Sequence, residues 1–330
     1  MKIETRRLLF FVSVVVALPV LANHSLPVRG QFDARPLQRL RATQPQVVLI
    51  SDSTLDNGVD PDLMQQSLGG RKVELLWHGG AASASWYLTL KNYVVASGTG
   101  PALVCVLFRD RMLTEPAFRT TGPYRGKIET QMHESEPVVD LVLGAGASGR
   151  VSRARWVDTI FPLNKRRHVQ QEKIERTVFR WVAASGVDVN AVERKVNGTF
   201  ALAHLRAEAA DEAGAISQQP EASFGADPAR SFLPHMVDLA VANQMRLCFL
   251  RVKRYPESDG RVAQSDALRS YMAELRAYLE SRGCAFIDDA EEPARTADMF
   301  LRPGDDHMSA EAKARSTELY AQKLRSLLPQ

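Results

Sequence analysis

The strongest constraint on the fold of this chain is a regular alternation of short apolar runs with helix-forming segments. The apolar runs have the length of buried strands, and they lie at residues 47–50, 73–77, 102–108, 246–252 and 284–287. Helices are expected at residues 61–68, 85–96, 170–184, 202–213, 233–243 and 266–282, and from a cap at Ser309 to about residue 327. Strands that are apolar throughout and alternate with helices predict a three-layer α/β fold, with a parallel sheet of about five strands covered on both faces.

The expected sheet also predicts where a functional site lies, because ligands of open parallel sheets bind at the carboxyl ends of the strands. Ser53 follows the first strand, in the sequence Ser51-Asp52-Ser53. A serine on the turn from a buried strand into a helix is exposed at this edge, with its backbone N–H in the same crevice. Such a serine combines a nucleophile with an oxyanion donor, although Asp and Ser are also common helix-capping residues.

A second candidate lies near the other end of the chain, where Asp305, Asp306 and His307 precede the last expected helix. A histidine beside a carboxylate can act as a general base, because the carboxylate fixes the tautomer of the ring and stabilises the imidazolium that forms. Acidic residues also favour helix starts for electrostatic reasons. Each of the two segments is therefore a weak indication when taken alone.

Taken together, the two segments resemble the first and last blocks of the SGNH (GDSL-like) hydrolases, a family with a flavodoxin-like three-layer α/β/α fold. Ser51 stands where the first block of the family has a glycine. The resemblance extends over about residues 45–112 and 230–328, and it leaves the segment between them uncovered. The implied fold is a central parallel sheet with a helical insertion or cap at residues 113–230.

The resemblance implies Ser53 as the nucleophile, His307 as its base, and Asp305 or Asp306 as the acid that orients the histidine. The usual acid of the family lies three residues before the histidine, where this chain has Gly304. Asp305 lies two residues before it and resembles the Asp-x-His version found in polysaccharide acetylation proteins. Asp305 is therefore preferred to Asp306 as the orienting acid.

The oxyanion donors are less clearly indicated. Gly79 and Gly80 follow the second strand, where the family places a glycine whose backbone N–H is an oxyanion donor. The asparagine of the family's third block is missing, and Arg109 follows the third strand instead. Arg109 could supply oxyanion donors, hold an anionic group of the substrate, or form an ion pair with a nearby acid. Asp52 is grouped with these residues as an oxyanion or substrate contact.

The implied activity is that of a serine esterase or O-acyltransferase. It would act on the acyl groups of a cell-envelope polysaccharide or a similar ester, with acetyl as the expected acyl group. No metal or cofactor is expected, and a membrane-bound O-acyltransferase is an expected partner. The alternative is a catalytically degenerate envelope scaffold or binding partner of such an acyltransferase. An enzyme requires Ser53 Oγ and His307 within hydrogen-bond reach, with a carboxylate on the far ring nitrogen, whereas a scaffold does not.

The N-terminus has the features of an export signal. Lys2, Arg6 and Arg7 precede an uncharged apolar stretch at residues 8–22, which predicts either a cleaved signal peptide or a retained signal anchor over residues 1–22. Either one places the domain at residues 23–330 in the periplasm or another extracytoplasmic space, with membrane contact through the N-terminal segment in the second case.

Composition argues against nucleic acid as a partner, since 42 basic and 38 acidic residues are interspersed and give a net charge of only +4. The three cysteines, Cys105, Cys248 and Cys284, lie inside apolar runs and are expected to be buried free thiols.

A competing interpretation comes from the pattern G-x-G-x-x-G at residues 144–149, after a strand-like run at residues 138–143. A dinucleotide site would require this segment to lie between a sheet strand and a helix N-terminus. The acidic residue that such a site needs about twenty positions further on is not clearly present, so a loop is the favoured interpretation.

Overall fold

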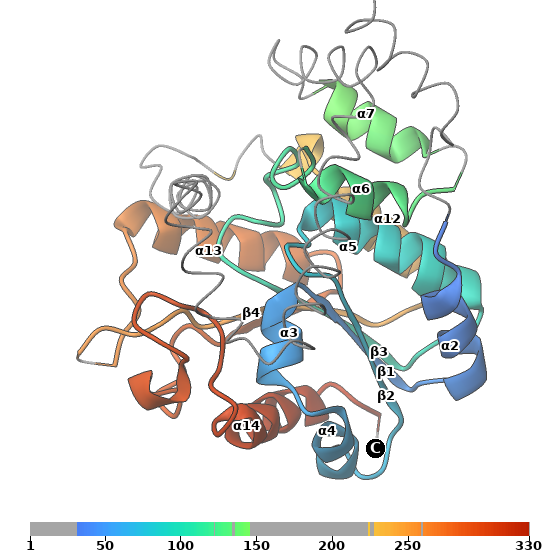
Figure 1. Ribbon diagram of the computed structural model, residues 1–330. Coiled ribbons are helices and arrows are strands. Elements are labelled where there is room, and N and C mark those ends of the chain that lie inside the picture. The colour runs from blue at the N-terminus through green and yellow to red at the C-terminus, as the bar shows by residue number, and fades with distance from the viewer. Residues whose placement is uncertain are drawn as a thin grey trace, which may run out of the picture. The chain divides into compact units, whose positions relative to one another are not determined.

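The computed structural model of the chain (Figure 1) describes residues 32–121, 123–133, 136–145, 224, 228–258 and 260–329. The chain divides into two compact units. One comprises Phe32–Thr120, Gln131–Gly146 and Ser217–Gln330, and the other Met1–Gln31, Thr121–Thr130 and Ala147–Ile216. In the second unit the described residues form one helix, α6 (Pro123–Glu129). The expected export signal and most of the expected insertion, including helices predicted at residues 170–184 and 202–213, lie outside the described residues.

The first unit contains a sheet of five parallel strands. The strands are β1 (Val47–Ser51), β2 (Val73–Trp77), β3 (Leu103–Phe108), β4 (Leu247–Arg251) and β5 (Ala285–Asp288). Their order across the sheet is β2-β1-β3-β4-β5, which is the order of flavodoxin-like folds. The predicted parallel sheet is therefore confirmed, and each strand lies within a residue or two of its expected position.

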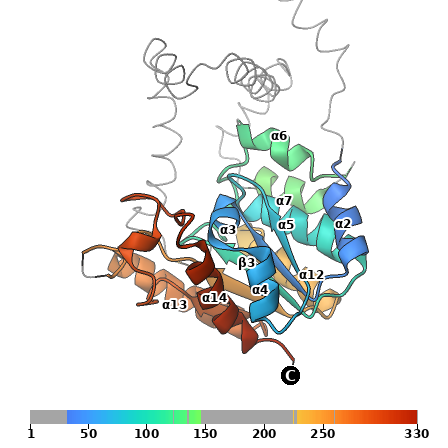
Figure 2. The ribbon, with the colours of Figure 1, turned by 60° about the horizontal axis from the view of Figure 1, so that its bottom comes forward.

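Helices cover both faces of this sheet. One face carries α3 (Ser53–Gly58), α4 (Pro61–Ser67) and α14 (Lys313–Arg325), and Figure 2 shows α4 and α14 side by side. The other carries α5 (Ser83–Thr89), the π-helix η1 (Leu90–Val95), α12 (Leu233–Ala242) and α13 (Asp266–Glu280), and α2 (Arg35–Thr43) packs against η1 (Figure 1).

The strands are apolar throughout because each of their faces is buried. Leu49, Cys105 and Leu250 belong to the core beneath α3, α4 and α14. Their neighbours Ile50 and Phe249 point to the opposite face and are fully buried as well. Burial on both faces replaces the apolar-polar alternation of a half-exposed strand with a continuous apolar run.

The segment at residues 138–143 is not a strand as expected but part of a helix, α7 (Pro137–Ala145). A short apolar run does not by itself distinguish a strand from a helix. Pro137 fits the first turn of a helix, where its missing N–H would have no partner in any case. Val139 and Val142, one helical turn apart, are the buried residues. Since Gly144 lies within this helix and does not follow a sheet strand, the dinucleotide interpretation is wrong.

The final helix starts later than expected. Ser309 Oγ accepts a hydrogen bond from the N–H of Ala312 at 3.2 Å, but this closes a turn, and α14 begins only at Lys313. The three cysteines are free and buried, as predicted. Within the described ranges, no helix combines the length and the apolar character that a membrane crossing requires.

Candidate active site

Ser53 lies at the carboxyl end of β1 as the first residue of α3. Asp52 caps this helix in an extended conformation, and its carboxylate accepts from the Thr54 N–H at 3.0 Å and the Thr54 hydroxyl at 2.8 Å. The Ser51 hydroxyl donates to the Leu107 carbonyl at 3.0 Å and ties the turn to β3. The N–H of the first helical residue has no acceptor within its own helix, so the Ser53 N–H remains available for an oxyanion.

His307 is held in a loop that folds back on itself between β5 and α14. Phe300 and Met308 form an antiparallel bridge, and the Leu301 N–H donates to the His307 carbonyl at 2.9 Å. This loop brings His307 Nε2 to 2.9 Å from Ser53 Oγ, although the two residues are 254 positions apart in sequence. The hydrogen-bond reach that an enzyme requires between these side chains is therefore present.

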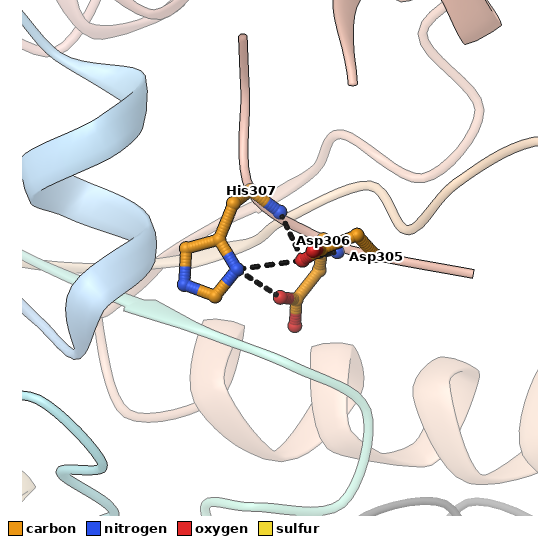
Figure 3. Close-up of side chains that lie close together, drawn as sticks. All are labelled: Asp305, Asp306 and His307. Atoms are coloured by element: carbon orange, nitrogen blue, oxygen red, sulfur yellow. Dashed lines mark hydrogen bonds and ion pairs between the residues drawn. The ribbon is translucent and has the colours of Figure 1, made fainter. Parts of the chain in front are cut away.

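Two carboxylates meet the other ring nitrogen of His307 (Figure 3). Asp305 Oδ1 lies 2.6 Å from Nδ1, and Asp306 Oδ1 lies 3.2 Å from it. Acceptors at Nδ1 require the proton on that nitrogen, which leaves the lone pair of Nε2 directed at the Ser53 hydroxyl. The shorter contact is that of Asp305, the acid that the sequence resemblance favours.

Asp305 is fixed by more than its contact with the imidazole. Its Oδ1 also accepts the backbone N–H groups of Asp306 at 2.8 Å and of His307 at 3.1 Å, and its Oδ2 accepts from Arg302 Nε at 3.1 Å. Burial opposes the ionisation of Asp305, but the hydrogen bonds from the side chain and backbone of His307 outweigh it and lower the pKa of this carboxyl. Asp305 is therefore ionised at neutral pH.

Asp52 is buried and forms ion pairs with two arginines. Its side chain is 3% exposed, and its Oδ2 forms ion pairs with Arg109 at 2.5 Å and Arg119 at 3.3 Å. Burial opposes the ionisation of Asp52, but the charge of Arg109 and the hydrogen bonds from Thr54 outweigh it, so its pKa is lowered. The Asp52 carboxylate accepts hydrogen bonds from Thr54 and pairs with two arginines, and these contacts anchor the turn that carries Ser53.

Arg109 forms ion pairs with acids, which is one of the three roles that the sequence left open. Its two terminal nitrogens form ion pairs with Asp52 and with Asp306, and its side chain is 13% exposed. Of the three roles open to it, ion pairing is the one that this geometry supports. The guanidinium thereby connects the residue before Ser53 with the residue before His307.

Gly79 and Gly80 form a tight turn after β2. The Ala81 N–H donates to the His78 carbonyl at 2.8 Å across this turn, and Gly80 has a φ of 75°, which glycine adopts without strain. The His78 N–H donates to the Ser51 carbonyl at 3.4 Å and holds the turn beside the end of β1. The glycine pair thus lies at the edge of the sheet that carries Ser53, as expected.

Sequence reasoning missed the second layer of ion pairs around these loops. Asp110 has a positive φ of 41°, accepts a hydrogen bond from Arg251 Nη2 at 2.8 Å and forms an ion pair with Arg254 Nε at 2.6 Å. Arg119, the second partner of Asp52, comes from a segment that carried no sequence signal. The only available indication was the run of charged residues directly after β3 and β4.

Among the described residues, Asp305, Asp306 and His307 are the group whose donor atoms lie close enough together for a metal ion, within 4.8 Å of one another. Their environment does not fit a cation. Asp306 is paired with the Arg109 guanidinium, and Asp305 with Arg302 and with the ring of His307. A metal ion would have to displace these cationic and N–H partners.

Fold and site together define a three-layer α/β protein with a serine–histidine–aspartate arrangement at the carboxyl ends of its strands. No protein-family model and no curated protein matches the chain. It is similar to the solved structure of a GDSL-like lipase from Bacteroides thetaiotaomicron, with 12% identity over 94% of this chain and 97% of that chain and a TM-score of 0.37. It is similar to the lipase/acylhydrolase from Enterococcus faecalis, with 11% identity, coverage of 86% and 96%, and a TM-score of 0.39.

A third similar structure is that of a mutant acetyl-xylooligosaccharide esterase from Geobacillus Stearmophilus, with 9% identity, coverage of 87% of this chain and 95% of that chain, and a TM-score of 0.38. The first of these three structures, the GDSL-like lipase, carries the name of the family that the two sequence blocks resemble. The likeness is distant, so the fold of this chain rests on its own sheet topology and its chemistry on its own site geometry.

Proposed function

We propose that this protein is a serine-dependent esterase or acyltransferase, with Ser53 as nucleophile, His307 as general base and Asp305 as the acid that orients the histidine. One observation carries the proposal. A single imidazole contacts Ser53 Oγ at 2.9 Å through Nε2 and Asp305 Oδ1 at 2.6 Å through Nδ1. A nucleophile on a base that is itself oriented by a third group is the recurring signature of nucleophilic catalysis.

In the proposed reaction, His307 Nε2 takes the Ser53 proton as the hydroxyl attacks an ester carbonyl. The resulting oxyanion accepts hydrogen bonds from the N–H groups of Ser53 and Gly80. As the tetrahedral intermediate collapses, His307 returns the proton to the departing alcohol and the acyl group stays on Ser53. Water or a second alcohol then attacks this acyl-enzyme with His307 again as base. Loss of an oxyanion donor of this kind lowers kcat about a hundredfold or more.

For the substrate we propose an acylated carbohydrate, with acetyl as the acyl group. The feature that supports a sugar ring is Trp77, the last residue of β2 and the register partner of Ser51. Its side chain is 39% exposed, at the end of the strand that leads into the Gly79–Gly80 turn. An exposed indole offers a flat apolar surface with a polar edge, which suits the alternating apolar and hydroxylated surface of a sugar.

We also propose that the protein acts outside the cytoplasm, as the sequence at residues 1–22 predicts, on a polysaccharide of the cell envelope and beside a membrane-bound O-acyltransferase. Fractionation of cells that produce the full-length chain tests this part. Recovery of the protein in the cytoplasmic fraction would exclude export, and the proposed catalysis would stand without it.

The central test is labelling of the purified full-length chain with a fluorophosphonate probe, which reacts with activated serines. Wild-type protein should be labelled, and Ser53→Ala and His307→Ala should not. Ser309→Ala is the matched control, since it removes a hydroxyl two residues from His307 that caps only a local turn. A folded wild-type protein that takes up no label would contradict catalysis and favour the scaffold interpretation.

A further inference from the structure

We infer that Arg109 is a positioning residue that ties the loop of the nucleophile to the loop of the base. The inference rests on the proposed function. One guanidinium joins two carboxylates from distant parts of the chain. Nη2 lies 2.5 Å from Asp52 Oδ2, and Nη1 forms an ion pair with Asp306 Oδ2.

Each of the two carboxylates belongs to the residue next to one of the reacting side chains. Asp52 directly precedes Ser53, and Asp306 directly precedes His307. The bridge Asp52–Arg109–Asp306 therefore runs parallel to the Ser53–His307 hydrogen bond, one residue behind each of the reacting side chains. A change in the separation of the two acids changes the separation of the nucleophile and its base.

Burial strengthens the two ion pairs of the bridge. The side chains of Asp52, Arg109 and Asp306 are 3%, 13% and 15% exposed, so water and salt screen their attraction much less than they would at the surface. Arg109 itself follows β3, which pairs with β1 and so has a fixed register relative to Ser53. The His307 loop contains no strand of the sheet, and the Arg109–Asp306 ion pair connects it to the end of β3.

The chemistry of the side chain explains why an arginine stands here. A guanidinium is planar and presents several N–H donors in fixed directions, so two of its nitrogens can hold two carboxylates at once. A lysine ammonium is a point charge on a flexible chain and does not define the separation of two partners. We therefore expect Lys at this position to keep the charge but to lose much of the alignment.

The test compares Arg109→Ala and Arg109→Lys with wild-type protein in hydrolysis of a neutral ester, p-nitrophenyl acetate, and in the rate of fluorophosphonate labelling. Arg109→Ala should lower kcat roughly a hundredfold, the effect typical of a misplacement of about 1 Å. KM should stay within about twofold, because Arg109 acts through Asp52 and Asp306 and does not touch the substrate. Arg109→Lys should lie between the two proteins.

Two further measurements separate positioning from a purely structural role. Added guanidinium chloride at millimolar concentration should restore part of the kcat of Arg109→Ala, because the ion can occupy the vacated space between the two acids. Arg39→Met is the matched control, since it removes an ion pair with Glu74 at the other end of β2 and should leave kcat unchanged. Thermal melting reports the folded fraction of each variant.

The outcomes are distinct. If wild-type protein neither hydrolyses the ester nor takes up label, the proposed function fails. If wild-type protein is active and folded Arg109→Ala has the same kcat and labelling rate, the inference about Arg109 is overturned while the proposed function stands. A rise in KM at constant kcat would also overturn it, in favour of a substrate contact. Should Arg109→Ala not fold, Arg109→Lys decides, since full kcat in that variant contradicts the need for a bridging guanidinium.

Discussion

Substitution of Asp305 by Asn should be unusually mild for the acid of a serine–histidine–aspartate arrangement. In the serine protease template, the same change lowers kcat about 10⁴-fold, because the amide stabilises the wrong tautomer of the histidine. In this protein, the backbone N–H groups of Asp306 and His307 donate to the same Oδ1 atom that contacts Nδ1. An asparagine would have to direct its carbonyl oxygen toward these donors, and that oxygen would still accept from Nδ1.

The expected magnitude follows from what remains and what is lost. The tautomer is retained, and the loss is limited to the negative charge on a hydrogen bond to His307. A charge-assisted hydrogen bond exceeds a neutral one by about 1 to 2 kcal/mol, which corresponds to roughly five- to thirtyfold in rate. The amide N–H₂ group would face Arg302, whose side chain is 77% exposed and can move into solvent.

Asp305→Ala provides the contrast, because it removes the acceptor of all three N–H groups and releases the loop. We expect a loss of roughly 10³-fold or more in kcat/KM for this variant. Both variants are measured by ester hydrolysis and by the second-order rate of fluorophosphonate labelling. A loss near 10⁴-fold for Asp305→Asn, or equal losses for the two variants, would refute the argument that the backbone donors fix the amide.

Three further predictions follow from the same structure. The pKa of Asp52 is lowered in the folded protein, so its ionised carboxylate should stabilise the fold above about pH 4, the region of an unperturbed aspartate. This stability should be lost as the pH falls through the folded pKa. Denaturant titrations between pH 7 and pH 3 should therefore show a shallower acid dependence for Asp52→Asn. Gly80→Ala forces alanine to a φ of 75° and should lower the rate of fluorophosphonate labelling at least tenfold. Gly98→Ala is the control, at a φ of 70° with open space around it, and should only lower the free energy of unfolding by about 1 kcal/mol. Equal labelling of the two variants would remove Gly80 from the site. The thiols of Cys105 and Cys248 are fully buried, and burial raises the pKa of Cys105, so iodoacetamide should react with them only after unfolding; rapid modification of native protein would show that the sheet opens locally.

The three-layer fold was readable in the sequence because its signals are local. A strand buried on both faces must be apolar along its length, so the five strands stood out as short apolar runs. Ser53 stands just after the first of these strands and His307 a few residues before the last helix, and the resemblance to the SGNH blocks linked the two segments. The choice of Asp305 over Asp306 came from a resemblance, and the shorter contact with Nδ1 agrees with it.

The interpretation of residues 138–143 as a strand was wrong for a related reason. An apolar run of this length satisfies either element, and what decides is which side chains find a partner in the tertiary structure. In α7 these are Val139 and Val142, one helical turn apart, while Leu141 between them is 60% exposed.

Ion-pair partners were decided by the tertiary structure alone. Arg109 had three open roles in the sequence, and Asp52 was grouped with the oxyanion or substrate contacts, because sequence separation gives no information about which charges meet. The fold brings the end of β1, the end of β3 and the loop before α14 together, and there Arg109 meets Asp52 and Asp306. Apolar pattern and backbone propensity are properties of a segment, whereas a buried charge is stable only beside the opposite charge that packing of distant segments supplies.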